Sequence, residues 1–144
     1  VAAVVSSGME IWEVEYAAYF SLLDGNAKAA RRLYEYVLFE TGNVVNDVAS
    51  GNFGALSPLA APSSAVNLAM IYSSTGSKRQ ALELYGLASG KERDRLVKAN
   101  MLYRMAEIQY DLGDRQNAEL TLELCISLDP TNADARLLKR RLKG

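Results

Sequence analysis

Histidine is absent from this sequence, and cysteine occurs only once, at Cys125. The lack of His removes the commonest general base and metal ligand of proteins, and a single Cys cannot form an intrachain disulfide. No apolar run approaches eighteen residues, so no membrane-spanning helix is expected. The paired carboxylates Glu13/Glu15 and Glu119/Glu123 fall on different sides of a helix or on a solvated face, which leaves acid-base catalysis without a site. We therefore expect a non-catalytic protein without cofactor or metal.

Strong charge of one sign is also missing, because 16 Lys and Arg stand against 17 Asp and Glu. This balance makes nucleic acid an unlikely partner. Only residues 131–144 are basic, and two interpretations apply to them. They can contact nucleic acid or acidic lipid, or they can form the polar face of a terminal helix whose cations suit its C-terminus. We prefer the second.

Glycine punctuates the chain at three similar places, within Asp24-Gly25-Asn26, Thr75-Gly76-Ser77 and Leu112-Gly113-Asp114. An apolar pattern of helical period precedes and follows each of them. Glycine accepts the left-handed conformation that closes a helix, and a polar residue after it can cap the next one. The pattern predicts three tight helical hairpins. Small residues would let the paired helices approach closely: Ala18 with Ala30, Ala69 with Ala81, and Ala106 with Ala118.

Each hairpin has an apolar face left over, which only a neighbouring hairpin can bury. The predicted fold class is therefore all-α, an α-solenoid of three helix-turn-helix units (residues 11–44, 62–95 and 99–132) with a capping helix at 133–143. We expect one domain over 1–144, with a long loop at 42–61 that contains a short helix near 44–50. The 37 residues from Gly76 to Gly113 predict that either the last helix of the second unit or the first helix of the third unit is extended through KERDRLVKAN.

Residues 99–132 resemble a tetratricopeptide repeat (TPR). The resemblance rests on Leu102, Met105, Ala106, Gly113, Asp114, Ala118, Leu122, Cys125, Ile126, Leu128 and Pro130. Residues 62–95 match the same family more loosely, and residues 11–44 are also similar to half-a-tetratricopeptide (HAT) repeats. Cys125 stands where the family has a small apolar residue, so we expect it to pack in the core.

The resemblance implies a concave groove lined by positions 2, 5, 6, 9 and 12 of each repeat, and we expect about half of these side chains to be buried. They are Trp12, Glu15, Tyr16, Tyr19, Leu22, Ser63, Val66, Asn67, Met70, Ser73, Asn100, Tyr103, Arg104, Glu107 and Tyr110. Members that bind chaperone tails carry a clamp of Lys, Asn and Arg. Asn67 and Arg104 match this clamp, whereas Glu15, Tyr19 and Asn100 do not. A chaperone tail is therefore not the expected ligand.

The implied function is a protein-interaction module or scaffold that binds a partner peptide or helix in this groove. Two alternatives stay open. One is a structural or self-associating segment whose groove is filled by its own loop or by a second copy, and the other is an RNA-processing scaffold of HAT type. We expect an intracellular soluble location rather than a secreted one, and a place within a larger chain or assembly.

Overall fold

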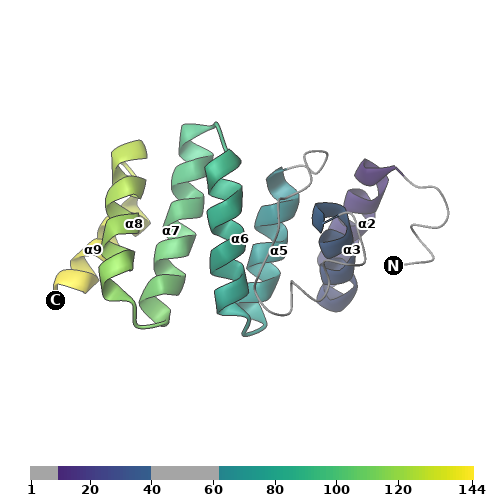
Figure 1. Cartoon of the computed structure of the whole chain (residues 1–144), viewed down its shortest axis with the longest axis horizontal. Coiled ribbons are helices and arrows are strands. Elements are labelled where there is room, and N and C mark those ends of the chain that lie inside the picture. Colours follow the sequence, from purple (N-terminus) through teal and green to yellow (C-terminus); the bar gives the residue numbers. More distant parts are fainter. Residues whose placement is uncertain (1–9, 40–61) are drawn as a thin grey trace. The chain divides into compact units, whose positions relative to one another are not determined.

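A computed structural model describes residues 10–39 and 62–144. These residues form α2 (Ile11–Leu23), α3 (Ala27–Phe39), α5 (Pro62–Ser74), α6 (Lys78–Lys91), α7 (Arg95–Asp111), α8 (Arg115–Leu128) and α9 (Ala133–Lys143), without any strand (Figure 1). The predicted all-α helical-repeat class is confirmed. The predicted loop at 42–61, with its short helix, lies outside the described residues.

The three glycines end their helices as predicted. Gly25, Gly76 and Gly113 have positive φ angles of 79°, 89° and 83°. After each one, the next residue's amide reaches back five positions, so that Asn26 N donates to Ser21 O, Ser77 N to Tyr72 O, and Asp114 N to Gln109 O, all at 2.8 Å. This is the Schellman closure of a helix. Asn26 and Asp114 then cap the next helix by accepting from the amides of Ala29 and Asn117.

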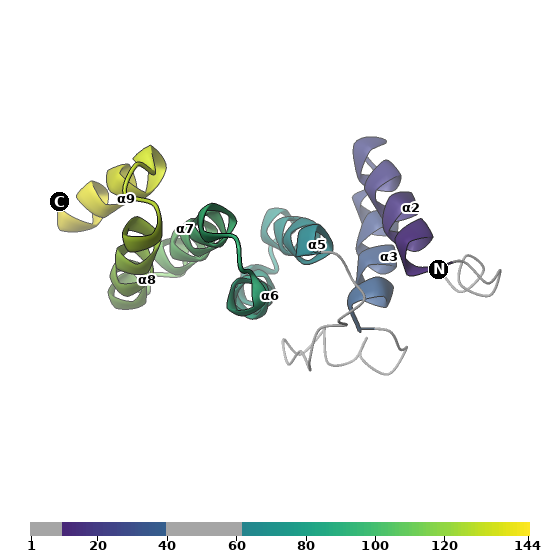
Figure 2. The same cartoon turned by 90° about the horizontal axis from the view of Figure 1, so that it is seen from above.

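The chain divides into two compact units between Leu84 and Tyr85, inside α6. Unit 1 contains α2, α3, α5 and the first half of α6; unit 2 contains the rest of α6 with α7, α8 and α9. Within unit 1, α2 lies beside α3, and within unit 2, α7 lies beside α8 (Figure 2). The six alanines expected at the hairpin contacts are all fully buried.

Apolar side chains of α2, α3, α5 and the first half of α6 form the core of unit 1. The most deeply buried are Val14, Ala18, Ala30, Tyr34, Val37, Leu38, Leu68, Ala69, Ala81 and Leu84. Two polar contacts fix α5 against the first hairpin. The Ser64 hydroxyl donates to the Glu15 carboxylate, and Asn67 Nδ2 donates to the Tyr34 hydroxyl at 3.0 Å. Burial raises the pKa of Tyr34, which keeps its hydroxyl neutral and able to accept this bond.

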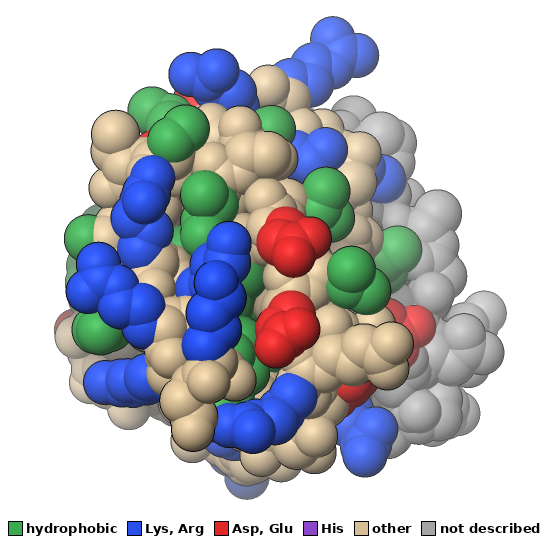
Figure 3. Space-filling view, turned by 90° about the vertical axis from the view of Figure 1, so that its left-hand side faces the viewer, with side chains coloured by type: hydrophobic (Ala, Val, Ile, Leu, Met, Phe, Trp, Pro, Cys, Tyr) green, Lys and Arg blue, Asp and Glu red, His purple; other side chains and the backbone are tan. Residues whose placement is uncertain are grey.

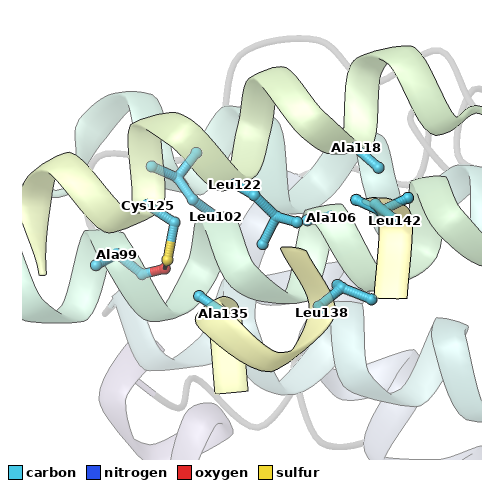
Figure 4. Close-up of a cluster of buried hydrophobic side chains, with 9 residues drawn as sticks. All are labelled: Ala99, Leu102, Ala106, Ala118, Leu122, Cys125, Ala135, Leu138 and Leu142. Carbon is cyan, nitrogen blue, oxygen red and sulfur yellow. Dashed lines mark hydrogen bonds between the residues drawn. The ribbon is translucent and has the colours of Figure 1, made fainter. Parts of the chain in front are cut away.

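The core of unit 2 joins α7, α8 and α9 around Leu122 and Cys125 (Figure 4). The Cys125 thiol is fully buried and donates to the Ala99 carbonyl at 3.1 Å. Burial raises its pKa to about 11, so the nucleophilic thiolate is scarce at neutral pH. The predicted structural role of Cys125 is thus confirmed by its position.

The extra length between Gly76 and Gly113 belongs to α7, which runs for 17 residues from Arg95. Asp94 caps its start by accepting from the amides of Leu96 and Val97 at 3.0 and 3.1 Å. Of the two possible extensions, the structure has that of the third unit's first helix: α7 begins four residues before the predicted repeat, whereas α6 ends at Lys91 and residues 92–94 are not helical. Among the described helices, none combines the length and apolar character needed to cross a bilayer.

Candidate functional site

A pocket of about 130 Å³ opens between α7 and α9 in unit 2. Its lining, called here the Tyr103 pocket, consists of Tyr103, Glu107, Tyr110, Asp111, Asp134, Leu137, Leu138 and Arg141. Three of these, Tyr103, Glu107 and Tyr110, are among the fifteen groove positions expected from the sequence. They follow one another at intervals of four and three residues, which places them along one side of α7.

Tyr103, Arg104 and Glu107 form a small network on α7. The Tyr103 hydroxyl donates to Glu107 Oε2 at 3.1 Å, and Arg104 Nη1 donates to Glu107 Oε1 at 3.1 Å. The Arg104 guanidinium also lies 5.8 Å from the centre of the Tyr103 ring. One carboxylate therefore holds both neighbours, and the Arg104 guanidinium is already paired within α7.

The electrostatics of the pocket are acidic. Its lining includes three carboxylates, those of Glu107, Asp111 and Asp134, against the single cation Arg141; Arg104, which lies outside the lining, pairs with Glu107. The pKa of Tyr103 is raised to about 12, first by burial and then by the charge and hydrogen bond of Glu107 and the charge of Asp134. Tyr103 therefore stays protonated well above neutral pH, and it donates its one hydroxyl hydrogen to Glu107.

Half of the lining comes from α9, which sequence reasoning treated only as a cap. The missed residues are Asp134, Leu137, Leu138 and Arg141. The signal was present, because a further 34-residue period starts at residue 133 and its positions 2, 5, 6 and 9 are these four residues. Asn132 starts α9 by accepting from the Ala135 amide at 3.0 Å. The last helix therefore lines the pocket in addition to closing the core.

The other expected residues of α7 lie outside the pocket lining. Asn100 is exposed, and Arg104 is half-exposed in its ion pair with Glu107. Binding of a partner by Asn100 or Arg104 stays a prediction.

In unit 1 the expected residues separate into two groups. Glu15 and Asn67 are half-buried and hydrogen-bonded within the unit, which gives both a structural role. Val66 is half-buried, and Met70 is exposed on α5. Trp12, Tyr16 and Tyr19 are exposed on α2. These side chains are available to a partner.

The described residues contain no group of three or more His, Cys, Asp or Glu side chains that is placed to hold a metal ion.

Comparison with known proteins agrees with the fold. Residues 99–132 match the tetratricopeptide repeat model, which confirms the resemblance over that range. Among curated proteins, none matches the chain. The first TPR of Spaghetti (RPAP3), solved with the HSP90 peptide SRMEEVD, superposes with a TM-score of 0.67 at 15% identity, over 92% of this chain and 90% of that one.

Two further solved structures are similar. The TPR domain of Sgt2 from Aspergillus fumigatus gives a TM-score of 0.62 at 16% identity, over 92% of this chain and 76% of that one. The type III secretion chaperone SycD from Yersinia enterocolitica was solved in complex with a peptide of the translocator YopD. It gives a TM-score of 0.60 at 14% identity, over 92% of this chain and 86% of that one. At these identities the likeness establishes the fold.

Proposed function

Because residues 99–132 match a tetratricopeptide repeat and the whole fold resembles TPR domains, we propose that this chain is a non-catalytic protein-interaction module that binds a peptide at the Tyr103 pocket. Two of the similar structures are peptide complexes. The observation that carries the proposal is the pocket itself, where predicted groove residues of α7 meet the corresponding positions of α9.

The ligand that suits this pocket carries a Lys or Arg side chain beside an apolar residue. The carboxylates of Glu107 and Asp134 attract a cation, and the rings of Tyr103 and Tyr110 can pack against its aliphatic stem. Leu137 supplies an apolar wall. An acidic peptide would meet like charges, which costs free energy in a partly desolvated site. The proposed specificity is thus opposite to that of a carboxylate clamp.

Panning a display library of short random peptides on the intact chain tests this proposal. We expect enriched sequences with Lys or Arg next to an apolar residue. The double variant Glu107→Gln with Asp134→Asn should lose them, whereas Glu119→Gln, an exposed change on α8, should retain them. The acidic peptide SRMEEVD serves as a negative probe.

Two results would contradict the proposal. Enrichment of acidic peptides would contradict the preference for a cation. If the double variant retained the same peptides as the parent, peptide binding would lie outside the Tyr103 pocket. Circular dichroism of each variant checks that its helix content is unchanged.

A further inference from the structure

Helix α2 is apolar on two opposite sides. Val14 and Ala18 are buried in unit 1, while the opposite side carries an exposed stripe, the aromatic face, made of Trp12, Tyr16, Tyr19, Phe20 and Leu23. Trp12, Tyr16 and Leu23 are 60 to 63% exposed. The Tyr16 and Phe20 rings contact each other, with centroids 5.2 Å apart. An apolar helix face that is this exposed is suited to a partner.

Charge indicates what kind of partner the aromatic face takes. Residues 10–24 contain four carboxylates, at Glu10, Glu13, Glu15 and Asp24, and no Lys or Arg. By the helical period Glu13 and Glu15 flank the stripe on its two sides, and Glu15 also accepts from the Ser64 hydroxyl of α5. A surface that combines aromatic rings with carboxylates favours a basic partner, since cations are attracted by both.

The last helix of the chain offers a surface of that chemistry. A hollow of about 180 Å³, the basic hollow, lies between α8 and α9 and is lined by Ile126, Arg136, Lys139, Arg140 and Lys143. Lys and Arg side chains gather on this side of the molecule, with hydrophobic side chains between them and acidic side chains next to them (Figure 3). The floor of the hollow is apolar, because long basic side chains line it with their aliphatic stems. None of its residues lines the Tyr103 pocket.

We propose that the aromatic face of α2 binds the basic hollow of a second copy of this chain. In this contact the exposed ring of Trp12 enters the hollow against Ile126, and the cations of Arg136 and Arg140 lie next to the rings and carboxylates of α2. The contact joins two different surfaces, so each pair of copies still has one free aromatic face and one free basic hollow. Such head-to-tail contacts add further copies as concentration rises.

Sedimentation of the intact chain at increasing concentration tests this inference. The parent mass should rise above the 15.7 kDa of one copy and should fall back in high salt, which screens the charges. The double variants Trp12→Ala with Tyr16→Ala, and Arg136→Glu with Arg140→Glu, should each bind themselves at least about thirtyfold more weakly, as loss of central aromatic or Arg contacts does elsewhere. Leu96→Ala, and Arg93→Glu with Arg95→Glu, change exposed residues elsewhere and should behave as the parent.

Mixing the two defective variants gives the decisive result. Each still has the surface that the other has lost, so the mixture should form a one-to-one pair and nothing larger. Trp12 is the only Trp in the sequence, and in the Arg variant it should shift its emission to shorter wavelength on mixing. A parent that stays monomeric, association that survives the Arg changes, or a mixture that stays monomeric would each overturn the inference. Peptide binding at the Tyr103 pocket is measured separately and does not depend on this result.

Discussion

Tyr103 and Glu107 are joined across one turn of α7, where the Tyr103 hydroxyl donates to the Glu107 carboxylate at 3.1 Å. The other carboxylate oxygen accepts from Arg104 at the same distance. This single carboxylate thus orients the tyrosine ring, holds the arginine outside the Tyr103 pocket, and leaves the pocket lining acidic. Removing the Glu107 carboxylate should therefore change both the pKa of Tyr103 and the binding of a basic peptide.

Replacing Glu107 by Gln should lower the pKa of Tyr103 from its value of about 12. The negative charge of Glu107 disfavours a second negative charge beside it, while the contribution of burial remains in the variant. The pKa should therefore fall but stay above the ordinary 10.0. An NMR titration of ring-labelled tyrosine measures this, with Glu119→Gln as the control. An unchanged Tyr103 titration would show that the hydrogen bond is not formed in solution.

Leu122→Ala should destabilise unit 2 by about 2 to 5 kcal/mol, the usual cost of a cavity at a fully buried Leu. Leu124 lies two residues further along α8 and is 58% exposed, so Leu124→Ala should cost little. Cys125 belongs to the same buried cluster as Leu122, and its reaction with a thiol reagent reports opening of that cluster. We expect labelling at least about thirtyfold faster in Leu122→Ala. Equal rates in the two variants would contradict the assigned core.

Gly113→Ala should lower the free energy of unfolding by about 1 to 2 kcal/mol, because a Cβ is disfavoured at its φ of +83°. No atom lies within 4 Å of the added Cβ, so the cost comes from the backbone alone. Gly90 is a matched control, since it lies in α6 without positive φ and has equal space. Gly90→Ala should be neutral or stabilising. Chemical denaturation followed by circular dichroism measures the free energy of unfolding of both variants. An unchanged value in Gly113→Ala would argue against the left-handed conformation at Gly113.

Glu35→Gln should reduce the pH dependence of unit 1 stability. Burial raises the pKa of Glu35 above 4.5, although the Tyr72 hydroxyl and Arg31, which lies 3.5 Å away, partly oppose the shift. The folded state therefore holds this proton more tightly than the unfolded state, and the stability from this group is lost as pH rises from 4.5 through the raised pKa. Over that pH interval the parent should lose stability, and the free energy of unfolding of Glu35→Gln should rise relative to that of the parent. Urea unfolding across the interval measures the difference, with Glu83→Gln as the exposed control. A difference in unfolding free energy between variant and parent that does not change with pH would contradict the burial of Glu35.

Local chemistry determined much of the fold in advance. Glycine between two helical patterns specifies where a helix must end, because only a left-handed residue closes it there, and this gave the turns at Gly25, Gly76 and Gly113. Periodic apolar residues specified which side of each helix is buried, as Ala106, Ala118 and Leu122 show. The start of α9 after Pro130 followed from the same punctuation.

The candidate site depended on packing between segments distant in sequence. The positions of Tyr103, Glu107 and Tyr110 were predictable from the repeat register, but their meeting with Asp134 and Arg141 required the angle at which α9 packs on α7. The hydrogen-bond partners of side chains were also not predictable from the sequence. Examples are the bonds of Glu107 to Tyr103 and Arg104. Others are those of Glu15 to α5 and of Asn67 to α3. The sequence alone determined helices and turns, since these depend on neighbours along the chain. Only the tertiary structure decided the pocket and its charge, since these depend on neighbours in space.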